Sequence, residues 1–202
     1  MTHKPTTAFQ PLTGIYEPSA IVQLPDGRFL VVEDEKSRPL SLVTLGADGG
    51  VESTALTAGL FQMFSEFWKL DDLEGLTIDR AGFVYAITSH SRDDDGGKKK
   101  SRERLVRFRV EGARVVDAKI VDGLKPALVK QHPVLAAAAE VRDVKGGGGL
   151  NIEALEMSPD QKRLLIGFRS PLREGRGLRQ DKARSGGEGE DMNRFHAYGF
   201  PR

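Results

Sequence analysis

Two glutamates in this sequence are each followed, at the same spacing, by a basic side chain. Glu74 precedes His90 by 16 residues, and Glu153 precedes Arg169 by 16 residues. A histidine beside a carboxylate is suited to act as a general base, because its ordinary pKa lies close to neutrality. We therefore predict that His90, Glu74 and Glu153 would be the catalytic residues of any enzymatic activity.

Further polar residues flank these positions and are predicted to bind a ligand: Asp72, Ser89, Arg92, Asn151 and Arg169. Carboxylates alternating with His and Arg can bind a cation, a sugar or a phosphate. The alternative is structural, with each Glu accepting backbone N–H groups and the Arg pairing with it. Both interpretations stay open, although Ser19 holds the equivalent position in the first copy of a repeated unit described below, so a structural role is not required in every copy.

The elements that must position these side chains belong to a repeated unit, found at residues 18–34, 73–89 and 152–168. Each copy has an apolar strand, a tight turn and a second apolar strand, which is a hairpin pattern. Third strands are predicted at 40–45 and 104–110, and fourth strands at 51–56 and 114–121. Repeated four-stranded antiparallel units are typical of a β-propeller, whereas a β-sandwich gives no reason for the hairpin to recur in register.

The predicted fold is therefore all-β and propeller-like, with about two and a half blades. In such a blade the start of the first strand and the end of the second lie at one end of the sheet. Pairing about the turns predicts Glu74 opposite Ser89 or His90, and Glu153 opposite Phe168 or Arg169. With the first strand innermost, both glutamates are expected near the mouth of a central channel.

The remaining segments divide the chain into an N-terminal tail (1–12), a partial propeller (13–176) and a disordered or aberrant C-terminal tail (177–202). Short helical insertions are predicted between blades, one or two turns within 57–70 and a helix interrupted near Pro133 within 124–141. The four-glycine run Gly146–Gly149 lacks the Lys-Ser/Thr of a phosphate loop and is interpreted as a flexible linker. No third or fourth strand is predicted after the last hairpin, because the final residues are charged and glycine-rich.

The composition excludes several classes of function. There are no cysteines and the four histidines are scattered, so no zinc site is predicted and no residue is assigned as a metal ligand, while the binding of another cation stays open. A net charge of +1 gives no general attraction to nucleic acid or membrane, and no stretch has the length of a membrane span. The charged run 92–102 is interpreted as a solvated hairpin. We expect a cytoplasmic protein, because the N-terminus lacks a secretory signal.

Several motifs also resemble those of an uncharacterised bacterial β-propeller family that is similar to the esterase-like domain of phytase. The resemblance covers about residues 15–176 and is carried by Asp71-Asp-Leu-Glu-Gly-Leu, Ser89-His-Ser-Arg, Ser101-Arg-Glu-Arg-Leu-Val-Arg-Phe, Gly149-Leu-Asn-Ile-Glu-Ala-Leu and Ile166-Gly-Phe-Arg-Ser-Pro-Leu. It implies a propeller fold and, through the related name, a phosphoester hydrolase. Family members continue with further blades, so the departure after Leu172 suggests a truncated or frame-shifted product.

Three functional hypotheses follow. The first is a propeller that binds a small polar or anionic ligand at the blade end rich in Glu, His and Arg. The second is a hydrolase of phosphoesters or esters, and the third is a truncated fragment without function. The sequence does not identify a cofactor, and the expected partner is a small molecule. Unpaired blade edges would also allow the chain to form oligomers.

Overall fold

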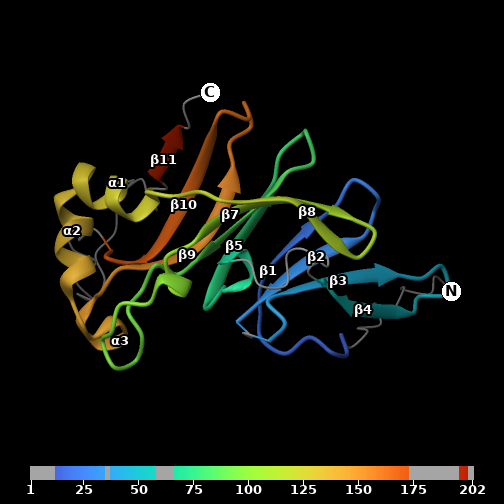
Figure 1. Ribbon diagram of the computed structural model, residues 1–202, viewed down its shortest axis with the longest axis horizontal. Coiled ribbons are helices and arrows are strands. Elements are labelled where there is room, and N and C mark those ends of the chain that lie inside the picture. Colours follow the sequence, from blue (N-terminus) through green and yellow to red (C-terminus); the bar gives the residue numbers. More distant parts are fainter. Residues whose placement is uncertain (1–11, 35–36, 58–65, 173–195, 200–202) are drawn as a thin grey trace, which may run out of the picture.

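The computed structural model describes residues 12–34, 37–57, 66–172 and 196–199, which form three antiparallel sheets (Figure 1). The first sheet has the order β1-β2-β3-β4, with β1 (Pro18–Gln23), β2 (Phe29–Glu33), β3 (Leu40–Leu45) and β4 (Val51–Ala55). The second has the order β5-β6-β7-β8, with β5 (Leu73–Ile78), β6 (Val84–Thr88), β7 (Leu105–Glu111) and β8 (Arg114–Ile120). The third contains β9 (Asn151–Met157), β10 (Arg163–Ser170) and β11 (His196–Gly199).

The three sheets are arranged as neighbouring blades of a propeller-like fold. The first strands lie next to one another, β1 against β5 and β5 against β9. The predicted all-β fold with four-stranded antiparallel units is therefore confirmed, including the third and fourth strands of the first two blades. We call the end of the blades where β1, β5 and β9 begin the mouth.

The hairpin turns at the opposite end form because their residues accept an unusual backbone conformation. Gly27 and Gly82 close the first two turns with φ values of +89° and +80°, which glycine adopts at little cost. Gln161 takes the same kind of conformation in the third turn, at φ +60°. Its side-chain Oε1 accepts a hydrogen bond from the backbone N–H of Arg80 at 2.8 Å, so the turns of blades 2 and 3 are tied together.

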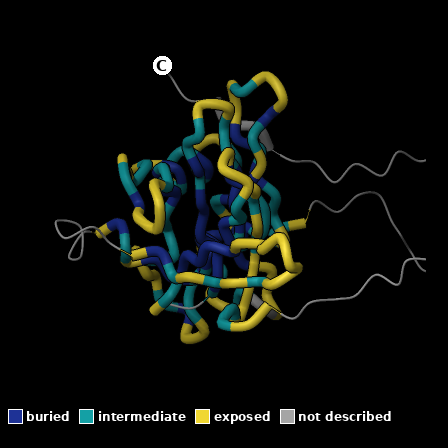
Figure 2. Tube along the Cα trace, turned by 90° about the vertical axis from the view of Figure 1, so that its right-hand side faces the viewer, coloured by how far each residue is buried: buried dark blue, intermediate teal, exposed yellow. Residues whose placement is uncertain are grey.

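Two apolar cores hold the blades face to face, and Figure 2 shows the buried strands in the middle of the molecule. Between blades 1 and 2, Leu30 and Val32 pack in one cluster with Val84 and Phe108. Between blade 2, blade 3 and the helices, the second cluster includes Ile87, Leu105, Leu128, Ile152 and Ile166. Alternate residues of the middle strands supply both cores, because successive side chains point to opposite faces.

Blades 2 and 3 approach closely at Gly75. A Cβ atom there would lie 2.7 Å from the backbone N of Leu155 and 2.8 Å from a methyl carbon of Ile87. At the mouth, the backbone N–H of Ile152 donates to the carbonyl of Ser89 at 2.8 Å. The glycine thus lets β9 lie against β5, and a backbone hydrogen bond fixes the contact.

Three helices connect blades 2 and 3: α1 (Leu124–Gln131), α2 (Pro133–Glu140) and α3 (Val144–Gly147). Pro133 is the first residue of α2, a position where proline's missing N–H costs nothing, so the predicted interruption is confirmed. Buried Leu124, Leu128 and Leu135 pack these helices onto the second core. The chain also has a short 3-10 turn at Glu66–Trp68, while residues 58–65 of the predicted insertion lie outside the described residues.

Two predictions about the end of the chain differ from the structure. The glycine run is not simply a linker, since Gly146 and Gly147 end α3 and the Asp143 carboxylate accepts the N–H of Gly146 at 2.7 Å. The last hairpin also has a third strand, because β11 pairs antiparallel with β10. No local pattern pointed to it in a segment otherwise charged and glycine-rich. Residues 1–11, 173–195 and 200–202 lie outside the described residues, so most of the two predicted tails is untested.

No helix among the described residues is long and apolar enough to cross a membrane.

Candidate functional site

The first strand of every blade carries a β-bulge at the same position near the mouth. The extra residues are Ser19 in β1, Glu74 in β5 and Glu153 in β9. In each case the residues before and after the extra one pair with two consecutive residues of the second strand, so the extra residue has no partner in the ladder. A bulge leaves its residue unpaired and re-aims the side chain, and bulges are common beside functional sites. The prediction that the two glutamates stand directly opposite residues of the second strand is therefore wrong, because the ladder skips them.

Four carboxyl groups influence one another at the mouth, and we call them the carboxyl cluster: Asp34, Asp72, Glu74 and Glu153. Glu74 is partly buried, and burial together with the charges of Glu153, Asp72 and Asp34 raises its pKa to about 8. Its carboxyl group makes no hydrogen bond or ion pair with any residue that the structure describes. At neutral pH Glu74 is thus mainly protonated and can donate a hydrogen bond.

Glu153 is held by two neighbours predicted to be ligand-binding residues. Its Oε1 accepts from Asn151 Nδ2 at 3.0 Å and from Arg169 Nη1 at 2.7 Å. The Arg169 side chain is 69% exposed, and Glu153, followed by Glu74 and Asp72, raises the pKa of its guanidinium. Asn151 Oδ1 is buried without a hydrogen-bond partner among the described residues, so it offers a free acceptor beside Glu153.

Asp72 is the best-satisfied member of the carboxyl cluster. Its Oδ2 accepts hydrogen bonds from the hydroxyls of Ser89 and Ser91 and pairs with Arg102 Nη1 at 3.1 Å. Its backbone carbonyl also accepts the N–H of Ser89 at 2.8 Å. Asp72 and Ser89 therefore lie together, as predicted, but they bind each other and hold the chain after β6 in place.

His90 does not lie with Glu74, contrary to the predicted catalytic pair. The imidazole is 1% exposed and its Nδ1 lies 2.9 Å from the carbonyl of Thr88. Burial lowers its pKa to about 4, and the nearby charges are those of Lys125 and Glu103. His90 has a left-handed backbone, with φ +56°, and its carbonyl accepts a hydrogen bond from Lys125 of α1 at 3.0 Å, on the helix side of the segment.

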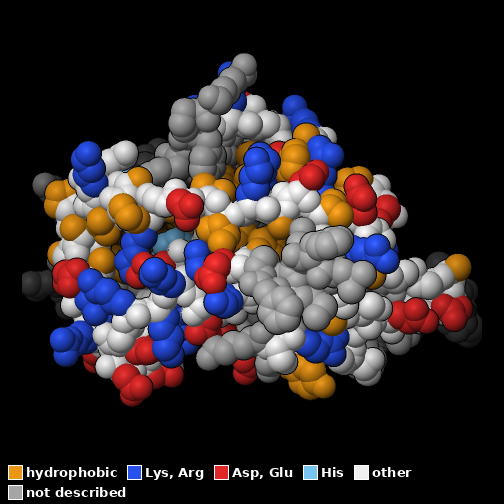
Figure 3. All heavy atoms as spheres, viewed as in Figure 1, with side chains coloured by type: hydrophobic (Ala, Val, Ile, Leu, Met, Phe, Trp, Pro, Cys, Tyr) orange, Lys and Arg blue, Asp and Glu red, His pale blue; other side chains and the backbone are white. Residues whose placement is uncertain are grey.

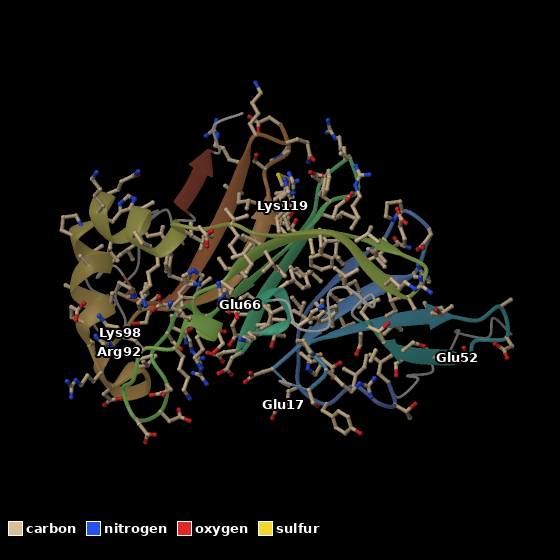
Figure 4. The ribbon with its side chains drawn as sticks, viewed as in Figure 1. Glu17, Glu52, Glu66, Arg92, Lys98 and Lys119 are labelled. Atoms are coloured by element: carbon tan, nitrogen blue, oxygen red, sulfur yellow. The ribbon has the colours of Figure 1, made fainter. Side chains whose placement is uncertain are left out.

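Arg92 is also directed away from the mouth. Its guanidinium donates to the carbonyl of Ala139 at 3.1 Å and pairs with Glu140 at 3.0 Å, so it fixes the loop after β6 to α2. Figure 4 shows Arg92 beside the helices, at the left of the view. The structure thus brings Glu74, Glu153, Asp72, Ser89, Asn151 and Arg169 to the mouth, and places His90 and Arg92 elsewhere.

Asp34 and Arg102 belong to the mouth, although the sequence did not single them out. Burial, followed by the carboxylate of Asp72, raises the pKa of Asp34, while Arg102 opposes this effect. The signal for Asp34 was present in the repeat, where it occupies the place of Ser89 in the second copy. Arg102 comes from the charged run after β6, whose composition gave no reason to expect it at the mouth.

The arrangement offers hydrogen-bond donors and acceptors. Within the described ranges, no group of three His, Asp or Glu side chains is placed to hold a metal ion. Protonated Glu74, the acceptor oxygens of Glu153 and Asn151, and the exposed Arg169 belong to neighbouring strands at the mouth, where Glu153 bonds to Asn151 and Arg169 and influences Glu74. Such a mixture can bind a polar molecule or move a proton.

No protein-family model matches the chain, and no curated protein matches it either. The esterase-like part of the family resemblance therefore gains no support. Among solved structures, the chain is similar to the PQQ domain of a pyranose dehydrogenase from Coprinopsis cinerea, with 14% identity and a TM-score of 0.44 over 77% of this chain and 28% of that one. It is also similar to a putative oxidoreductase (glucose dehydrogenase) from Thermus thermophilus, with 21% identity and a TM-score of 0.41 over 77% of this chain and 38% of that one. The chain spans less than two fifths of either structure, and the propeller-like fold is established here by the three sheets themselves.

Proposed function

We propose that the mouth binds a small, uncharged and hydroxyl-rich molecule, such as a sugar or polyol, without transforming it. The observation that carries this proposal is the grouping of Glu74, Glu153 and Asn151 on two adjacent bulged strands. Glu74 has a carboxyl group without a partner among the described residues, and Asn151 has an unsatisfied buried oxygen. Hydroxyl groups are both donors and acceptors, so they can satisfy such a set.

The charge at the mouth argues against an anionic ligand. The carboxyl cluster has four members, and the two arginines beside it are already in ion pairs. Arg169 pairs with Glu153, and Arg102 pairs with Asp72. An anion would be repelled by the ionised carboxylates unless it displaced Glu153 from Arg169. An uncharged polyol would meet no such repulsion and would hydrogen-bond to the carboxylate oxygens directly.

A second candidate is a hydrolase, and one observation favours it. Glu74 retains its proton near pH 7 because its pKa is raised to about 8, and the ion-paired Glu153 lies close by. Two carboxyl groups in different environments are a common source of general acid and base. His90 would not take part, because it is buried away from this pair.

Binding of D-glucose, D-mannitol and myo-inositol can be measured by isothermal titration calorimetry and by the shift in melting temperature at pH 7. We expect at least one polyol to bind and to raise the melting temperature, because a ligand specific for the native state stabilises it. Glu153→Gln and Asn151→Ala should each weaken binding at least tenfold. Glu52→Gln is the matched control, since Glu52 lies on β4, away from the mouth (Figure 4).

Two outcomes would overturn the binding proposal. One is the absence of binding by any polyol while inorganic phosphate binds, which would indicate an anion site. The other is polyol binding that survives both mouth variants. Turnover of ester or phosphoester substrates that Glu74→Gln abolishes would favour the hydrolase instead.

A further inference from the structure

A concave site lies beside the helices, across the segment Thr88–Ser91 from the mouth. It is a hollow of about 360 Å³ between α1, α2 and the loop that precedes β7. We call it the helix hollow; its lining residues are Lys98, Glu103, Lys125, Pro126, Val129, Ala136, Ala139 and Glu140. Its volume falls at the lower end of the range of small-molecule pockets.

Half of the helix hollow is apolar. Pro126 and Val129 line it from α1, and Ala136 and Ala139 line it from α2. Small side chains at these helix positions leave room that larger ones would fill. Figure 3 shows hydrophobic side chains at the left of this face, next to a group of Lys, Arg, Asp and Glu side chains. The wall therefore suits an aliphatic group.

The other half carries two lysines and two glutamates, and one of the glutamates, Glu140, also pairs with Arg92 at 3.0 Å. The Lys125 ammonium donates to Glu103 Oε1 at 2.6 Å and to the carbonyl of His90 at 3.0 Å. These two side chains are only 12% and 28% exposed. An ammonium has three N–H groups, so one donor of Lys125 and the second oxygen of Glu103 have no partner among the described residues and can bind a ligand.

The outer pair is looser. Lys98 Nζ lies 3.4 Å from Glu140 Oε1, and both side chains are more than half exposed, at 58% and 71%. An ion pair this open contributes little to stability and can exchange partners readily. Figure 4 places Lys98 next to the helices, at the edge of this region.

We propose that the helix hollow binds a free α-amino acid with an aliphatic side chain. The ligand carboxylate would bind Lys125 and Lys98, its ammonium would bind Glu103 and Glu140, and its side chain would lie on the alanine and valine wall. A zwitterion can pair with both signs of charge in the hollow, whereas an ion of one sign would leave two like charges facing it. This site shares no residue with the mouth, so it can be tested separately from the proposed function.

The test uses L-leucine as the probe, with calorimetry on the full chain at pH 7.5. We expect saturable binding of L-leucine, and at least tenfold weaker binding of 4-methylpentanoic acid and of 3-methylbutylamine, which each lack one of its charges. Ala136→Leu should abolish binding by filling the hollow. Ala137→Leu is the matched control, because Ala137 is the next residue of α2, is exposed and does not line the hollow.

The proposal is overturned if L-leucine produces no binding signal, or if Ala136→Leu binds it as well as Ala137→Leu does. Equal affinity for the amine alone would indicate a cation site and would also contradict it. Glu74→Gln should leave L-leucine binding unchanged, which separates this result from the polyol experiment. Melting curves of both alanine variants establish that each is folded.

Discussion

The carboxyl cluster and the helix hollow lie on either side of the segment Thr88–Ser91 and handle charge in opposite ways. At the mouth, like charges face one another, and the pKa of Glu74 is raised to about 8. In the hollow, opposite charges face one another: Lys125 pairs with Glu103, and Glu140 pairs with both Lys98 and Arg92. The contrast shows that one short segment can separate a cluster of like charges from a set of ion pairs.

Removing Asp72 should have the largest effect, since this residue fixes the segment that separates the two sites. Asp72→Ala would remove the carboxylate that Arg102 and two serine hydroxyls share, and would leave Arg102 with the more distant carboxylate of Asp71, at 3.5 Å. We expect a loss of about 3 kcal/mol in the free energy of unfolding, measured by urea denaturation. Glu17→Ala is the control, because Glu17 holds the equivalent place in blade 1 but is exposed (Figure 4). Equal losses of stability in both variants would contradict this assignment.

Acidification should destabilise the helix side through His90. The pKa of His90 is about 4 in the folded protein, against an ordinary value of 6.5. Between pH 6.5 and 4 the imidazole is therefore protonated in the unfolded chain but neutral in the folded chain. The free energy of unfolding should therefore fall by about 2 to 3 kcal/mol between pH 6.5 and 4 through this group.

His90→Asn should flatten this pH dependence when unfolding is measured at intervals of half a pH unit. Asparagine is the suitable replacement, because it tolerates the positive φ of this position better than most residues. An unchanged slope in His90→Asn would assign the acid sensitivity to other groups.

Alkaline conditions should destabilise the mouth through Glu74. Its pKa is raised, so the folded chain retains a proton that the unfolded chain has released, and stability falls as the pH rises from 4.5 to 8. Glu74→Gln should raise the free energy of unfolding by about 1 to 2 kcal/mol at pH 8.5. At pH 4 it should change nothing, because the carboxyl group is then protonated in both states. A gain that is the same at both pH values would contradict this account.

Breaking the exposed ion pair of the helix hollow should have the smallest effect. Lys98→Ala removes a contact between two open side chains, so the free energy of unfolding should change by less than about 0.5 kcal/mol. Lys125→Ala should cost several times more, because it leaves Glu103 and the carbonyl of His90 without their buried donor. Thermal melts of the two variants measure this difference, and equal melting temperatures would refute it.

The blades could be predicted because their signals are local. Turn residues such as Pro25-Asp26-Gly27 and the alternation of β7 depend on neighbours in sequence, and these strands formed as expected. The bulges could not be predicted, since an extra residue in a short strand leaves the apolar pattern almost intact. Pairing Glu74 with His90 failed for this reason, together with the left-handed backbone at His90.

The features that the sequence did not predict depend mainly on contacts between residues far apart in the chain. Arg92 binds α2, which is 47 residues away at Ala139, and no spacing rule connects the two. β11 pairs with β10 across a segment of charged, glycine-rich sequence, so no periodic pattern indicated it. Asp34 was missed for a simpler reason, because the repeat replaces it with a serine in the second copy.

The ties between blades 2 and 3 have a consequence for selectivity. The Ser89–Ile152 hydrogen bond joins the blades at the mouth, and the Arg80–Gln161 hydrogen bond joins them at the opposite end. Because the two blades are joined at both ends, they cannot rotate apart about either end. The distance between Glu74 and Glu153 is therefore fixed in the free protein. If the mouth binds a polyol as we propose, a site preorganised in this way should discriminate by size, because it could not widen to admit a larger ring.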